Sequence, residues 1–142
     1  MKAMNVARRP SWFGVAVLVG FVYGAVGVLL AIPSGHARLW RLAAWVISAA
    51  IYFLQVGYEH FRLRNSVLAS SFHVAAAVSI GGFALAVAAT VHSFVVVPPY
   101  PRTRLYLAVV LWPLLTGIPA FLVAFALTGL LTWLTPRPES QS

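Results

Sequence analysis

The sequence predicts an all-α integral membrane protein, a four-helix bundle of four transmembrane helices that forms a single domain over residues 1–142. The chain is 61% hydrophobic and only 8% charged. Soluble domains carry about 25% charged residues, so this chain has too few charges to cover a surface that faces water. Its apolar residues fall into four long runs, and a bilayer core of about 30 Å needs roughly 20 such residues per span. Tryptophan and tyrosine gather near several run ends, which is typical of membrane interfaces.

The first run, residues 12–32, is uncharged and ends at Pro33. The basic residues Lys2, Arg8 and Arg9 precede it, as they would precede the apolar core of a signal peptide. Such a core has about 7–15 residues, whereas this run has about 21. Its length therefore favours a membrane span over a cleaved leader.

Three further runs predict spans over residues 42–58, 67–97 and 105–134. The last contains Pro113 and Pro119, and each proline removes a helical hydrogen bond, so we expect a bend there. With about 30 residues, that run is also longer than a straight crossing requires.

The basic residues are distributed slightly unevenly about these four spans. Six lysines and arginines lie in the N-terminal segment, the second loop and the tail, and four lie in the first and third loops. Because the more basic side usually faces the cytoplasm, we expect both termini to be cytoplasmic, in a bacterial-type inner membrane. The net charge of +8 is then explained by contacts with anionic lipid head groups and by the orientation of the spans. No nucleic-acid partner is predicted.

The polar residues of the second run share one helical face. At about 100° per residue they fall within a narrow arc from mid-membrane to the surface, whereas His60 lies off it. The main residues of this stripe are Tyr52, Gln55, Glu59 and Arg62. Polar groups that face lipid would stay unsatisfied, so we expect the stripe to face other helices or a wet cavity.

The third run carries a stripe of small and polar residues. It comprises Ser66, Ser70, His73, Ala77, Gly81, Ala84, Ala88 and His92. The short connection from Glu59 to Ser66 predicts that the second and third helices are antiparallel neighbours. We therefore predict a polar cluster at one end of this hairpin, with Arg62 within reach of an ion pair with Glu59. The cluster comprises Tyr52, Gln55, Glu59, Arg62, Ser70 and His73.

Glycines indicate where helices pack closely. Gly20, Gly24 and Gly27 form a small-residue seam on the first run, and Gly81 lies on the small stripe of the third run. Small residues at this spacing let helix backbones approach each other in lipid. We expect these four glycines to mark packing surfaces or self-association.

Glu59 and His73 leave two interpretations open. An Arg–Glu pair beside a membrane surface commonly anchors a turn, and an interhelical hydrogen bond satisfies a histidine without chemistry. Ionisable residues inside membrane spans also mark proton and ligand sites. The sequence leaves both a structural role and a proton or ligand site open for these two residues.

Catalytic chemistry finds little support in the sequence. The chain has no cysteine and no aspartate, and Glu59 and Glu139 are its two carboxylic residues. There is no phosphate-binding glycine loop and neither HxxxH nor HExxH, so no catalytic residue and no metal site are predicted, and enzyme activity is not favoured.

Haem b is an alternative, because two histidines from different helices can ligate it. The candidate ligands are His36, His60, His73 and His92. However, 19 residues separate the two histidines of the third run, about 28 Å along a helix, which puts both sites near the membrane surfaces. No cofactor is predicted under the first of the hypotheses below.

The sequence is compatible with three functions. The first is a non-catalytic accessory or assembly subunit of a larger membrane complex, whose partners are the lipid bilayer and other membrane subunits or further copies of this chain. The second is a small oligomeric transporter or proton-coupled carrier that uses Glu59 and His73. The third is a redox membrane subunit that binds haem b or quinone through its histidines.

Overall fold

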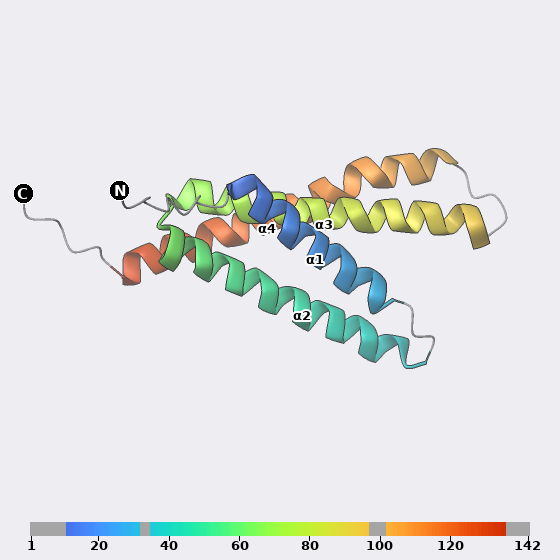
Figure 1. Cartoon of the computed structure of the whole chain (residues 1–142), viewed down its shortest axis with the longest axis horizontal. Coiled ribbons are helices and arrows are strands. Elements are labelled where there is room, and N and C mark those ends of the chain that lie inside the picture. The colour runs from blue at the N-terminus through green and yellow to red at the C-terminus, as the bar shows by residue number, and fades with distance from the viewer. Residues whose placement is uncertain (1–10, 32–34, 97–101, 136–142) are drawn as a thin grey trace, which may run out of the picture.

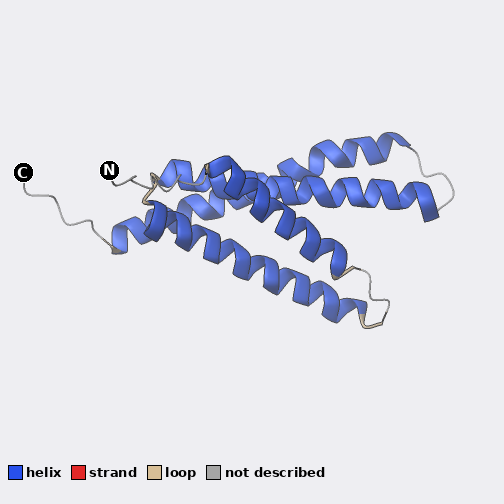
Figure 2. Ribbon diagram, in the orientation of Figure 1, coloured by secondary structure: helices blue, strands red, loops and turns tan. Residues whose placement is uncertain are grey.

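A computed structural model describes residues 11–31, 35–96 and 102–135 of the chain. Its elements, in order, are α1 (Trp12–Leu29), α2 (Ala37–Tyr58), a π-helical turn η1 (Glu59–Leu63), α3 (Val67–Val96) and α4 (Arg102–Leu134). All four long helices have the length and apolar composition to cross a membrane. Figure 2 shows helices joined by short connections, which confirms the predicted all-α bundle of four membrane helices.

The helices begin and end close to the predicted spans, with two extensions. α2 begins at Ala37 and α4 at Arg102, so arginines that were predicted to lie in loops lie in first helical turns. Hydropathy marks where a helix leaves the apolar layer, but backbone hydrogen bonds continue past that point. A long arginine side chain near a span end can extend its charged group to the interface.

α1 packs against α3 through the predicted glycine seam. A Cβ atom added at Gly20 would lie 2.6 Å from Ile80 Cγ2, and one added at Gly81 would lie 2.6 Å from Tyr23 Cβ. Gly24 faces Ala84 in the same way, and Gly27 faces Leu85. The four predicted packing glycines thus all lie at the α1–α3 contact, where only a hydrogen in place of a side chain permits this approach.

α4 packs along the other side of α3. Gly117 lies against Ser79, and Gly82 lies against Thr116. The Ser79 hydroxyl also donates a hydrogen bond to the backbone oxygen of Pro113 at 3.2 Å. α4 continues as one helix through both prolines. Small residues therefore bring the backbones of α3 and α4 together, as they do for α1 and α3.

α2 is placed differently from the prediction. The small-residue stripe of α3 was expected to face α2, but its Ala77, Gly81 and Ala84 face α1. Figure 1 shows α2 meeting the other helices at the end that holds Glu59 and lying apart from α3 and α4 at the end that holds His36. We call these the Glu59 end and the His36 end. A Cβ atom at Gly57, the glycine of α2, would meet nothing within 4 Å, so α2 has no glycine contact that could compete for α3.

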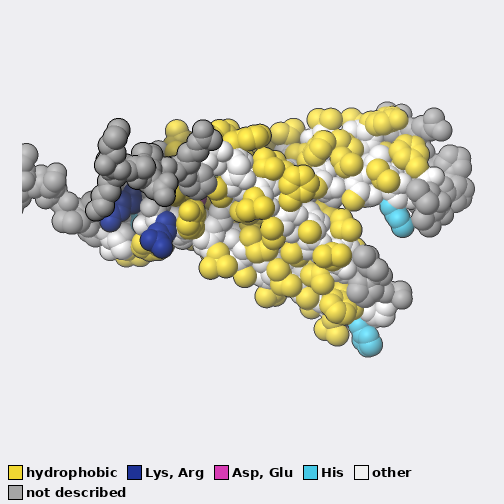
Figure 3. All heavy atoms as spheres, in the orientation of Figure 1, with side chains coloured by type: hydrophobic (Ala, Val, Ile, Leu, Met, Phe, Trp, Pro, Cys, Tyr) yellow, Lys and Arg dark blue, Asp and Glu magenta, His cyan; other side chains and the backbone are white. Residues whose placement is uncertain are grey.

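The surface agrees with a membrane environment. Figure 3 shows hydrophobic side chains over most of the visible face, arginine or lysine side chains gathered at the Glu59 end, and histidine side chains at the tips of the two diverging pairs of helices. Large apolar residues are exposed on every helix, Trp45 and Trp133 most of all. A surface of this kind is stable against lipid and not against water.

Candidate functional site

The connection between α2 and α3 folds back onto Glu59. The π-helical turn ends at Leu63, and Arg64 follows in the left-handed region with φ of 52°. Asn65 comes next, and its side-chain amide donates a hydrogen bond to Glu59 Oε2 at 2.6 Å. The Ser66 hydroxyl then accepts from the backbone N–H of Ala69 at 3.3 Å and begins α3. Single π-helical turns are rare and occur frequently at functional sites.

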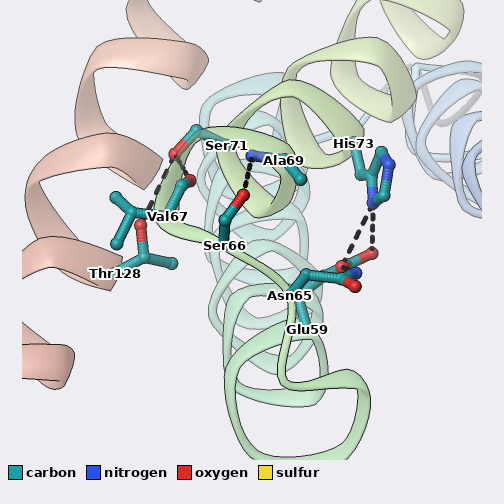
Figure 4. Close-up of polar contacts among 8 residues, drawn as sticks. All are labelled: Glu59, Asn65, Ser66, Val67, Ala69, Ser71, His73 and Thr128. Atoms are coloured by element: carbon teal, nitrogen blue, oxygen red, sulfur yellow. Dashed lines mark hydrogen bonds and ion pairs between the residues drawn. The ribbon is translucent and has the colours of Figure 1, made fainter.

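Glu59 and His73 form the centre of the site (Figure 4). His73 Nδ1 lies 3.2 Å from Glu59 Oε2 and 3.3 Å from Oε1, so the imidazole faces both carboxylate oxygens. Only 2% of the Glu59 side chain and 13% of the His73 side chain are exposed. The pair thus joins the end of α2 to the first third of α3 in a place that water scarcely reaches.

Trp12 covers His73 from α1. The two rings are stacked, with centroids 4.8 Å apart and planes 8° from parallel, and the indole also meets the Phe72 ring edge-on. α1 begins here because Ser11 caps it by accepting from the backbone N–H of Gly14 at 3.2 Å. The indole therefore covers one face of the imidazole and fixes the plane of the His73 ring.

The structure brings together part of the predicted polar cluster. Glu59 and His73 are in contact, whereas the Tyr52 hydroxyl donates to the backbone oxygen of Ala120 in α4 at 2.6 Å. Ser70 is buried beside the start of α3, and Gln55 is buried on α2. These five residues lie on inward-facing surfaces, but they do not form one hydrogen-bonded group among the described residues.

The predicted ion pair between Arg62 and Glu59 is not among the ion pairs of the described residues. Arg62 is exposed, and the ion pair recorded at Glu59 is with His73. The reason is the π-helical turn, in which hydrogen bonds span five residues. In this wider turn a residue three positions on no longer lies above the first, so the α-helical spacing rule fails here.

The other three histidines make no hydrogen bond to the Glu59–His73 pair among the described residues. His60 Nε2 is 3.3 Å from the hydroxyl of Thr135, the residue that follows α4. His36 precedes α2 with a φ of 54°, and both His36 and His92 are exposed. Over residues 11–31, 35–96 and 102–135, no group of three or more His, Cys, Asp or Glu residues could hold a metal ion. Haem or quinone binding by these histidines stays a prediction.

Sequence reasoning missed Asn65 and Trp12. Neither residue was among the predicted site residues, and Trp12 counted only among the tryptophans near the ends of the apolar runs. A signal for Trp12 was present, since it starts the first span at the same membrane end as the predicted polar cluster. A signal for Asn65 was absent, because its contact depends on the left-handed turn at Arg64.

The imidazole and the carboxylate lie at hydrogen-bonding distance, which is the geometry that proton transfer between two such groups requires. A hydrogen bond between the imidazole and the carboxylate needs one proton between them, and adding a second changes the pair from a net negative to a neutral one. In a place this dry, such a change of charge strongly alters how firmly neighbouring groups are held. The Asn65 amide and the Trp12 ring are the groups that would respond.

Comparisons of the chain with protein-family models, with curated proteins and with solved structures find no match. The candidate site therefore rests on its own geometry, which places a carboxylate, an imidazole, a carboxamide and an indole from three segments of the chain around one buried position.

Proposed function

We propose that this integral membrane protein is a small proton-coupled carrier in which the Glu59–His73 pair takes up and releases the coupling proton. The observation that carries the proposal is the burial of Glu59, whose side chain is 2% exposed and whose carboxylate lies 3.2 Å from the His73 imidazole. Ionisable residues inside membrane proteins are costly to bury and commonly mark ion or proton paths. An arginine in place of His73 would also pair with Glu59, but its side chain keeps its charge and could not take up or release a proton.

The position of the pair supports coupling to movement. His73 belongs to α3, the helix that packs against both α1 and α4, and Glu59 belongs to the turn at the end of α2. α2 makes few other contacts, and most of its apolar residues toward the His36 end are exposed. A proton on the pair changes a buried polar link between the end of α2 and α3, so α2 is the element whose position would follow protonation.

The test is proton uptake by proteoliposomes that contain the purified protein and a pH-sensitive dye. A potassium gradient with valinomycin sets an inside-negative potential, and the fall of internal pH is followed. We expect the unmodified protein to acidify the lumen faster than empty liposomes, and Glu59→Gln to abolish this excess. Glu139→Gln is the matched control, because Glu139 is the other carboxylic residue of the chain.

Two outcomes would contradict the proposal. One is proton uptake by the unmodified protein that is no faster than in empty liposomes, and the other is an equal loss of flux in Glu139→Gln and Glu59→Gln. Thermal aggregation of the solubilised variants separates lost flux from lost folding. Glu59→Gln is chosen because its amide can still accept from Asn65 and His73.

An accessory or assembly subunit of a larger membrane complex is the second candidate. It is favoured by the exposure of α2, where Trp45, Val46 and Leu54 are 77%, 67% and 73% exposed. A helix that leaves its own bundle has room for a neighbour in the membrane. Native mass spectrometry of the protein from its own membrane tests this, and stoichiometric foreign subunits would support it. A lone chain or a homo-oligomer would count against it.

A further inference from the structure

Gln55 carries buried hydrogen-bonding groups that the protein leaves unpaired. The residue is 6% exposed, and neither its side-chain nitrogen nor its oxygen has a hydrogen-bond partner among the described residues. The hydroxyl of Tyr23, a residue that is 8% exposed, is in the same position. Buried polar atoms nearly always have partners, and each exception calls for a ligand, a water or an ion.

Gln55 extends the site that Glu59 begins, and Tyr23 belongs to the neighbouring cluster against which Tyr52 packs. Gln55 lies one helical turn before Glu59 on the same face of α2, about 6 Å along the helix axis. Tyr52 lies a further three residues back, and its ring packs against the cluster of Tyr23, Ala16 and Ala77. A row of buried polar side chains therefore leads from the Glu59–His73 pair toward the middle of the membrane.

We infer that this row binds internal water, held by the Gln55 carboxamide and the Tyr23 hydroxyl, next to the Glu59 carboxylate. A carboxamide offers two donors and a carbonyl oxygen with two lone pairs, and a buried water makes about three hydrogen bonds. A larger ligand fits less well, because the adjacent Val56 packs tightly with Val74 and Ala124, all of them buried.

The role of this water rests on the proposed function, whereas its presence does not. If Glu59 takes up protons, the water is the route by which they reach it from the membrane interior. Along such a route each oxygen releases one proton as it receives another, and Glu59 accepts the last one. No group is oxidised or reduced, and no co-reactant is needed.

The sequence offers a selective probe for this site. Gln55 and Gln141 are the two glutamines of the chain, so ¹⁵N-glutamine introduced by cell-free synthesis labels two side-chain amides. Water-edited solid-state NMR in bilayers then measures how fast water polarises each one. We expect the Gln55 side chain to be polarised within about three times the build-up time of Gln141, and the Gln55 backbone amide at least tenfold more slowly.

Three variants assign the NMR signals and test the contributions of Tyr23 and Gln55. Gln141→Ser assigns the two signals. Tyr23→Phe should slow the transfer to Gln55 at least twofold, and an unchanged rate would remove Tyr23 from the site. Gln55→Met keeps the side-chain length without polar atoms and should slow proton uptake at least tenfold in the liposome assay.

The failures of the two proposals are distinguishable. A Gln55 side chain that is polarised as slowly as its own backbone overturns the water site, even if Glu59→Gln abolishes proton uptake. Rapid polarisation of the Gln55 side chain by water, together with unchanged proton uptake by Glu59→Gln, overturns the proposed function and leaves the water site intact.

Discussion

α3 and α2 are both long membrane helices, yet they are held in opposite ways. Within the most apolar 18 residues of each span, 39% are buried in α3 and 11% in α2. α3 meets α1 and α4 through glycine and other small residues along its length. In lipid no hydrophobic effect drives helices together, so close van der Waals packing decides which pairs form. α2 has no glycine in contact with another helix and lies at the edge of the bundle.

α2 is held in the half nearer the Glu59 end, by three side-chain hydrogen bonds and by the packing of Val56 against Val74 and Ala124. Tyr52 bonds to α4, Glu59 to His73 of α3, and His60 to Thr135 after α4. The first of these lies near the middle of the bundle and the others at the Glu59 end. α2 is therefore attached at one end, and the comparison with α3 shows where a movement would begin.

The largest expected effect comes from the packing of α3. Gly20→Leu places a side chain where even a Cβ atom would lie 2.6 Å from Ile80 and 2.9 Å from the backbone oxygen of Ala77. Since the backbone cannot yield locally, we expect a loss of about 3 kcal/mol in the free energy of unfolding, near the top of the range for overpacked cores. Equilibrium unfolding in mixed micelles measures it.

Gly129→Leu is the matched control on α4, because a Cβ atom there meets nothing within 4 Å. We expect it to change stability by less than about 0.5 kcal/mol. Equal losses in the two variants would mean that the glycine seam does not set the α1–α3 contact.

A smaller effect is expected from the link between α2 and α3. Glu59→Ala leaves His73 and Asn65 without their acceptor, and we expect a loss of about 2 kcal/mol. Distance measurements between spin labels on α2 and α3 should broaden at the same time, because the attached end is released. Glu59→Gln should lose less than half as much, and an α2 position unchanged in both variants would refute one-ended attachment through this pair.

The smallest effect is expected from the link between α2 and α4. Tyr52→Phe removes a single hydrogen bond to Ala120, and bonds of this kind in membrane proteins contribute about 0.6 kcal/mol. Tyr58→Phe is the control, since Tyr58 is 43% exposed and should change stability by less. If Tyr52→Phe destabilised the protein more than Glu59→Ala, the hydroxyl rather than the ion pair would be the main attachment of α2.

Much of the fold was predictable because it follows from local composition. Four apolar runs, their approximate ends and the glycine seam of α1 could all be read from the chain, since each depends on neighbouring residues. Glu59 and His73 could be nominated for the same reason, as polar residues on inward faces beside a short turn. The helix that faces the small stripe of α3 could not be predicted. α1 carries glycines that allow close packing, and α2 is joined to α3 by a short connection, so either helix could have packed there.

The sequence by itself determined that this is a membrane protein of four helices and that a group of polar residues lies beside the turn between the second and third of them. Composition and periodicity suffice for this, because lipid offers no hydrogen-bond partners and the polar backbone groups must be satisfied within helices. The tertiary structure decided which groups meet. The π-helical turn and the left-handed Arg64 turned Glu59 away from Arg62 and toward His73 and Asn65. Such pairings depend on where three segments cross in space, and helical spacing within any one of them does not encode that.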